Sequence, residues 1–93
     1  MKKIIGYVGV DSGQLIIADP CYLREWKDGR SDDTSCQYGK ACEVTCTGEY
    51  AGEVLIAGIQ GTGVAFATGG DGAFPIYAQF NEEGRITKIE IEL

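Results

Sequence analysis

The chain has 93 residues, a formal net charge of −6 and no histidine. This length corresponds to a single domain spanning residues 1–93, and the acidic balance disfavours nonspecific binding to nucleic acid or to an anionic membrane surface, since both require exposed Lys and Arg side chains. The absence of histidine excludes Ser-His and Cys-His nucleophile pairs and any histidine metal ligand.

The first apolar run, residues 4–10, follows Met1-Lys2-Lys3 and ends at Asp11. It lacks the long core and cleavage site of a signal peptide, and no segment approaches the ~20 apolar residues of a membrane span. We therefore expect a cytoplasmic protein whose four cysteines are reduced.

Residues 3–10 are rich in β-branched side chains and predict a strand. Residues 11–13 form a short loop in which Gly13 can adopt a positive φ, and residues 14–18 predict the partner strand of a hairpin. Pro20 ends this second strand because it has no backbone N–H to donate.

Residues 22–26 predict one helical turn, with Leu23 and Trp26 on the same face at positions i and i+3. The next segment, residues 27–40, is polar and longer than most connections in a compact domain, so it predicts one long loop that is either functional or mobile. Tyr38 lies in this segment. We expect Trp26 and Tyr38 either to anchor the loop or to contact a ligand.

Polar and apolar residues alternate over residues 41–47, with Cys42 and Cys46 on one face, which predicts a strand. In a strand these two cysteines would lie about 13 Å apart, whereas thiolates that share a zinc ion lie within about 4 Å of each other. The chain also has no Cys-x-x-Cys pair. We therefore expect buried apolar cysteines and no bound metal; a zinc site that also uses Cys21 and Cys36 is the alternative.

The second half of the chain alternates short apolar segments with glycine-rich turns. Its glycine clusters are not nucleotide-binding fingerprints, because no Gly-Lys-Ser/Thr occurs; we expect turns, with an anion-binding nest of backbone amides as the alternative. About seven short antiparallel strands predict an all-β fold, a small barrel or sandwich with one long loop. The predicted strands of this half cover residues 53–57, 64–68, 74–80 and 85–93, and the last two form a hairpin across residues 81–84.

Two motifs stand out, one formed by residues 10–14 and 19–22 and the other by residues 70–77. Each combines Asp, Gly, Pro and aromatic residues, which is more than a turn alone requires. Their carboxylates, Asp11, Asp19 and Asp71, are typical of turns in which the side chain accepts backbone N–H groups. We expect the two hairpins to place these loops near one end of the domain, where the carboxylates can also bind a ligand or a hard cation. The expected ligand-binding residues are Asp11, Asp19, Tyr22, Trp26, Asp71, Phe74 and Tyr77, with Arg24, Lys27, Arg30 and Lys40 as contacts of an anionic ligand.

At these motifs the chain resembles a family of uncharacterised small β proteins of bacteria and their phages. The resemblance lies in residues 10–14 (VDSGQ) and 19–22 (DPCY), and in residues 70–77 (GDGAFPIY) followed by 84–86 (GRI). The second motif also resembles part of a larger domain of unknown function. The resemblance implies a compact β domain of phage or prophage origin. Small phage proteins often act on host machinery by binding, and some sequester nucleotide signals of antiviral defence.

We therefore expect a non-enzymatic binding module without a cofactor, whose partner is a small-molecule ligand or a host protein. Neither a membrane nor nonspecific nucleic acid is an expected partner, and a homo-oligomer is compatible with the sequence. One alternative is a hydrolase that uses carboxylates such as Asp19 and Asp71 as acid and base. Another is a structural protein–protein interaction module that assembles through acidic faces and exposed strand edges.

Overall fold

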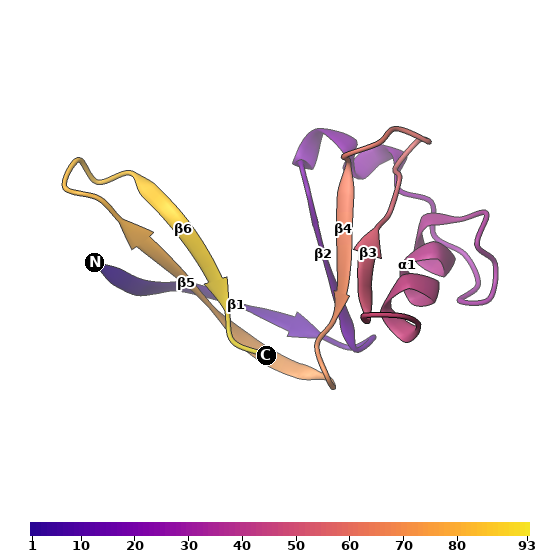
Figure 1. Ribbon diagram of the computed structural model, residues 1–93, viewed down its shortest axis with the longest axis horizontal. Coiled ribbons are helices and arrows are strands. Elements are labelled where there is room, and N and C mark those ends of the chain that lie inside the picture. The colour runs from indigo at the N-terminus through magenta and orange to yellow at the C-terminus, as the bar shows by residue number, and fades with distance from the viewer.

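A computed structural model describes all residues, 1–93, as two antiparallel three-stranded sheets with one short α-helix. Figure 1 shows the two sheets diverging like the limbs of a V, with the helix on one limb only. None of the helices has the length and apolar content needed to cross a membrane. The elements are β1 (Lys2–Val10), β2 (Gln14–Ala18), the 3-10 helix η1 (Pro20–Glu25), α1 (Gln37–Cys46), β3 (Ala51–Glu53), β4 (Gly63–Ala67), β5 (Gly72–Phe80) and β6 (Ile86–Ile91).

The mainly β character is confirmed, but the finer expectations of the fold are not. The chain has six strands rather than seven, the sheets do not close into a barrel, and no layer of one sheet covers the other. The sheet of order β1-β5-β6 is called the arm below. The sheet of order β2-β4-β3, with η1 and α1, is called the body.

The hairpin at the end of the chain is confirmed. β5 and β6 pair antiparallel, and the turn between them is held by Asn81, whose side-chain oxygen accepts the backbone N–H groups of Glu83 and Arg85 at 2.9 and 3.0 Å. This is the local turn chemistry that Asn-x-x-Gly sequences provide.

The predicted first hairpin is wrong, because β1 pairs with β5 and β2 pairs with β4. β1 and β5 each have nine residues and stay paired from Lys2 opposite Gln79 to Val10 opposite Gly72, apart from one bulge. β2 has only five residues and matches the five of β4. The connection 11–13 therefore carries the chain from one sheet into the other instead of closing a hairpin.

The connections 11–13 and 68–71 cross between arm and body side by side, in a region called the junction below. The backbone N–H of Thr68 donates to the carbonyl of Gly13 at 2.9 Å, and a Cβ placed on Gly13 would lie 4.0 Å from a carboxylate oxygen of Asp71. Gly13 and Gly69 adopt φ values of 70° and 82°, which favour glycine. Figure 1 shows that the sheets diverge from this point.

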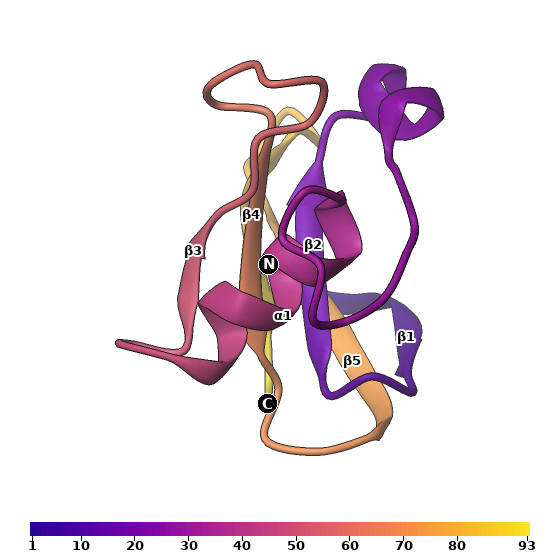
Figure 2. The same ribbon diagram turned by 90° about the vertical axis from the view of Figure 1, so that its right-hand side faces the viewer.

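The body has a small core between α1 and one face of its sheet. Ala41 of α1, Ala65 of β4 and Val54 are buried together, and Ile16, Trp26 and Val44 pack against them. Figure 2 shows α1 lying across the β2-β4-β3 sheet. Small side chains at the contact allow the helix to approach the strands closely.

The strand predicted for residues 41–47 is wrong, because these residues belong mostly to α1. Thr45 is buried in this helix and its hydroxyl donates to the carbonyl of Ala41 at 2.9 Å and to the side-chain oxygen of Gln14 at 3.0 Å. Cys46, expected to be buried, is exposed, and Cys42 is half-buried one helical turn away. The spacing argument against a shared metal therefore does not apply. The chain has no group of three or more His, Cys, Asp or Glu side chains placed to hold a metal ion.

Two other expected elements differ from the prediction. The strand predicted at residues 53–57 is wrong, because β3 covers Ala51–Glu53 and shares only Glu53 with it. Beyond it Ile56 is completely buried, and its backbone N–H donates to the hydroxyl of Thr62 at 2.7 Å. The long loop expected at residues 27–40 ends at Cys36, where α1 begins.

Replacing Gly39 with Ala is expected to destabilise the protein by about 1–3 kcal/mol. An added Cβ would overlap the carbonyl oxygen of Asp33, which crosses over the first turn of α1. Helix propensity alone predicts the opposite sign, since Ala is more favourable than Gly in a helix by about 1 kcal/mol. Urea denaturation measures the difference.

The matched control is Gly9→Ala, because a Cβ at Gly9 would have no atom within 4 Å. Its free energy of unfolding is expected to be unchanged or slightly raised. Stability of Gly39→Ala equal to or above the wild type would contradict the close packing of residues 29–36 on α1.

Candidate functional site

The body contains a mainly apolar pocket of about 110 Å³ between β2, α1 and the segment that follows η1. Two aromatic side chains, Trp26 and Tyr38, contribute to its wall, and Ser12 and Gln14 are the polar residues among its lining. The complete lining is Ser12, Gln14, Leu15, Ile16, Trp26, Tyr38, Ala41 and Ala65.

The position of Trp26 is fixed by the backbone of the next residue. The carbonyl of Lys27 accepts the N–H groups of Gln37 and Tyr38 at 3.0 and 3.3 Å, and its own N–H donates to the side-chain oxygen of Gln37. The indole N–H of Trp26 donates to the carboxylate of Asp28 at 3.0 Å. These bonds tie the chain beside Trp26 to the first turn of α1, so that both aromatic residues face one pocket.

A second set of polar contacts holds the opposite wall. The side-chain amide of Gln14 donates to the sulfur of Cys42 at 3.3 Å, while its oxygen accepts the hydroxyl of Thr45. Cys42 is also a polar neighbour of Tyr38, and as a hydrogen-bond partner it raises the pKa of the Tyr38 phenol above its ordinary value. The phenol hydroxyl is therefore engaged with Cys42, whose sulfur also accepts the side-chain amide of Gln14.

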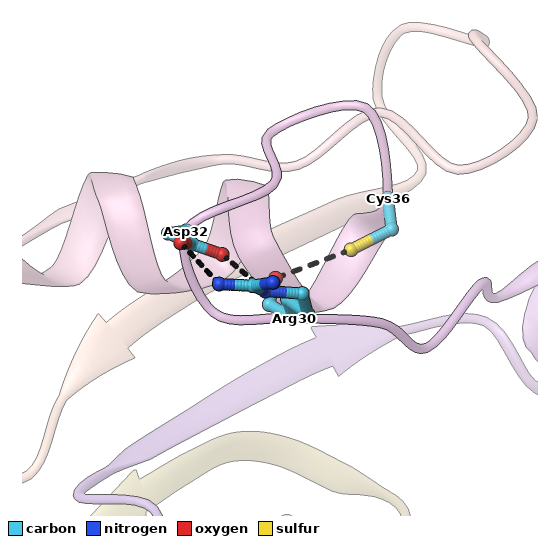
Figure 3. A network of polar contacts seen from close by, with 3 residues as sticks. All are labelled: Arg30, Asp32 and Cys36. Atoms are coloured by element: carbon cyan, nitrogen blue, oxygen red, sulfur yellow. Dashed lines mark hydrogen bonds and ion pairs between the residues drawn. The ribbon is translucent and has the colours of Figure 1, made fainter.

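Residues 28–36, called the strap below, connect the pocket to the start of α1. Figure 3 shows that the guanidinium of Arg30 points to Asp32, with two nitrogen–oxygen distances of 3.0 Å, while Cys36 points to the backbone of Arg30. The sulfur of Cys36 donates to the carbonyl of Asp33 at 3.1 Å and accepts the N–H of Gly39 at 3.3 Å. Cys36 is therefore a buried cap of α1 rather than a metal ligand.

The four cations expected to contact an anion differ in their availability. Arg30 is paired with Asp32, and Lys40 lies 2.6 Å from a carboxylate oxygen of Glu43. Arg24 and Lys27 form no ion pair within the chain. Since Lys27 follows Trp26 directly, it is the free cation next to the pocket in sequence.

The structure brings the loops of Asp11 and Asp71 together at the junction and places Asp19 at the other end of β2 (Figure 1). The separation follows from the absence of the predicted first hairpin. The carboxylate of Asp19 accepts the backbone N–H of Cys21 at 2.9 Å, which lowers the pKa of Asp19 and caps η1. Tyr22 lies within η1, far from the junction.

Phe74 and Tyr77 lie on the arm and outside the pocket. Phe74 is opposite Val8 and Tyr77 is opposite Ile4, on different faces of the sheet. The ammonium group of Lys2 lies 4.7 Å from the centre of the Tyr77 ring. Of the seven expected ligand-binding residues, Trp26 is the one that lines the pocket.

Sequence reasoning missed the contributions of Gln14 and α1 to this pocket. The available signal was the spacing of Tyr38, Ala41, Cys42 and Thr45 at positions i, i+3, i+4 and i+7, which is typical of one helix face. The alternation of polar and apolar residues over residues 41–47 predicted a strand instead, so this helical spacing was overlooked. Gln14 gave no signal, because its role depends on contacts with residues about thirty positions away.

A second hollow, of about 310 Å³, lies beside the start of α1. It is more open, contains no aromatic side chain, and is lined mostly by polar residues of the strap and α1 together with Leu55 and Gly58. The aromatic pocket therefore offers the more selective surface for a ligand.

Comparison with protein-family models, curated proteins and solved structures found no match for this chain. The motif resemblance to small phage and bacterial proteins stays a prediction.

The stability of the strap is expected to fall in acid. The hydroxyl and the backbone N–H of Ser35 both donate to the carboxylate of Asp33, and they lower the pKa of Asp33. The folded state then binds fewer protons than the unfolded state, so the free energy of unfolding decreases as the pH falls below about 5.

The variant Asp33→Asn keeps an oxygen acceptor but has no charge to lose. Its free energy of unfolding is expected to depend less on pH than that of the wild type between about pH 5 and pH 3. Urea denaturation at a series of pH values measures both slopes. Equal slopes in the two proteins would show that Asp33 does not take part.

Proposed function

We propose that the chain is a non-enzymatic binding module whose pocket receives one planar heteroaromatic ring, such as the base of a nucleotide. The observation that carries the proposal is the pocket between Trp26 and Tyr38. Its volume of about 110 Å³ is well below the ~300–1,000 Å³ of sites that enclose a whole drug-sized ligand, and it approaches the ~150 Å³ cavity that holds benzene. A single ring of the ligand would enter, and the rest would stay outside.

The polar groups of the pocket favour a ring with hydrogen-bonding edges over a purely apolar one. The Ser12 hydroxyl has no partner within the chain, and the amide of Gln14 has one N–H left after its bond to Cys42. A nucleobase offers both a face for aromatic stacking and edges for these groups.

Lys27 supports a nucleotide over an uncharged heteroaromatic compound. It is exposed, forms no ion pair, and its backbone is bonded to Tyr38, which lines the pocket. A phosphate group outside the pocket would find this ammonium nearby. On the motif resemblance alone, the proposal extends to a phage or prophage protein that sequesters a nucleotide signal of antiviral defence.

The geometry does not support the carboxylate hydrolase. Asp19 and Asp71 lie at opposite ends of β2, roughly 15–20 Å apart at the usual rise of a strand. Paired catalytic carboxylates of glycosidases lie within about 10 Å of each other. The pocket lining itself contains no carboxylate or lysine, so binding without turnover is the function that its chemistry favours.

Trp26 is the only tryptophan of the chain, so its fluorescence reports directly on the pocket. We expect nucleoside monophosphates to change the Trp26 emission with a saturable dependence on concentration. Tyr38→Ala is expected to weaken binding by about 5- to 150-fold, which corresponds to the ~1–3 kcal/mol of one base–aromatic stack.

The control variant is Tyr50→Ala, which removes an exposed aromatic ring that does not line the pocket. Its affinity is expected to equal that of the wild type. If no nucleotide changes the Trp26 emission, or if both variants bind equally well, the pocket is not a nucleotide site.

A further inference from the structure

The chain exposes more surface than a compact protein of its mass. Its accessible surface is 6360 Å² for 10.0 kDa, whereas folded monomers of this mass expose about 5,200 Å². The radius of gyration is 14.5 Å, against about 12 Å for a compact domain of this length. The excess of about 1,100 Å² arises because arm and body do not cover each other (Figure 1).

One face of the arm is almost entirely apolar. Residues opposite each other in neighbouring strands share a face, and on this face Val8 is opposite Phe74, Ile76 is opposite Ile91, and Ala78 is opposite Ile89. Ile89 is 49% exposed, whereas Ala78 is completely buried and Val8, Phe74, Ile76 and Ile91 are half-buried. No helix or second sheet packs over the arm, so this apolar face has no covering layer.

The body has an uncovered apolar face of its own. α1 covers the side of Ile16 and Ala65, and the opposite side carries Phe66 and the cross-strand pair Ile17 and Val64, with Glu53 of β3 beside Val64. Of these, Ile17 is 60% and Val64 is 45% exposed. The chain thus carries two apolar sheet faces, each without a partner.

The junction prevents the two faces from closing on each other within one chain. Connections of three and four residues join the sheets side by side, and the Thr68–Gly13 hydrogen bond ties them together. A second chain of the same shape does not have this restriction. Its arm can lie on the body of the first chain while its body receives the first chain's arm.

The distribution of charge favours contact between arm and body over contact between two bodies. Residues 1–10 and 72–93, which form the arm, carry four basic and four acidic side chains. Residues 11–71 carry four basic and ten acidic side chains, and hence the whole net charge of the chain. An arm can approach a body without net repulsion, whereas two bodies repel each other.

We propose that the chain forms a two-fold symmetric dimer by reciprocal exchange, in which the apolar face of each arm covers the uncovered face of the other copy's body. The excess surface of about 1,100 Å² per chain exceeds the ~800 Å² that each partner buries in a standard interface. A closed two-fold arrangement covers all four apolar faces at once and leaves none to recruit further copies.

Light scattering coupled to size exclusion tests the proposal, with an expected mass of twice 10.0 kDa. Ile89→Glu on the arm and Val64→Glu on the body would each place a charge in the interface, and each is expected to reduce the mass to that of one chain. Tyr7→Glu adds the same charge to the opposite face of the arm, where Tyr7 is 68% exposed, and is expected to remain a dimer.

Mixing the two monomeric variants distinguishes reciprocal exchange from arm-to-arm packing. The arm of Val64→Glu and the body of Ile89→Glu are both unmodified, so one of the two contacts can form in a mixed pair. The mixture is therefore expected to regain dimers that neither variant forms alone. Ile86→Glu, near the tip of the arm, replaces Ile89→Glu if circular dichroism shows that the latter is unfolded.

A wild-type chain that is monomeric at all concentrations up to about 100 μM, far above the micromolar range of ordinary interfaces, would overturn the proposal. Dimers that persist in both Glu variants would overturn it too, since the interface would then lie elsewhere, for example at a strand edge. A mixture that stays monomeric would exclude the reciprocal arrangement.

Discussion

The structure depends on one constraint, the pair of short connections that joins arm and body. Because both connections cross at the same place and are hydrogen-bonded to each other, the two sheets cannot share a core. Only 12 of the 93 residues are buried, and few of these are large. A small domain gains much of its stability from buried apolar area, so a fold with so small a core gains stability from any further apolar burial against a second chain.

The body obtains rigidity from polar contacts where its apolar core is small. The strap is bonded to itself through Asp33 and Ser35, to α1 through Cys36, and the chain before it is held through Lys27. These bonds are made largely by the backbone, so they fix position without filling volume. The pocket remains open for this reason: the aromatic residues beside it are held by their neighbours rather than by packing against each other.

The sequence predicted the elements that local chemistry specifies. The β5–β6 hairpin follows from the turn at residues 81–84 and the alternation of β6, and β4 follows from its apolar run. The helical turn predicted at residues 22–26 is present as η1, two residues earlier, because Asp19 caps it and Pro20 begins it. The pairing of strands that are distant in sequence could not be predicted. Nothing local distinguishes β2 from β5 as the partner of β1, because the β1–β5 pairing joins residues more than sixty positions apart.

The same limit applies to the candidate site. Trp26 and Tyr38 could be selected from the sequence as aromatic residues in a polar segment. That they line the same pocket depends on α1, whose Cys, Val and Thr residues alternate as in a strand and so concealed the helix. The motifs that contain Asp11 and Asp71 stood out in the sequence, and the loops of these two residues lie side by side because they form the junction. Their distinctive sequences are explained by that turn, so a ligand is not needed to account for them.

Small-angle X-ray scattering over a dilution series tests most directly whether arm and body remain apart. We expect the forward scattering of two chains at high concentration and, on dilution, that of a single chain with a radius of gyration near 14.5 Å. A particle of one chain with a radius near 12 Å at every concentration would contradict it, because arm and body would then have folded onto each other.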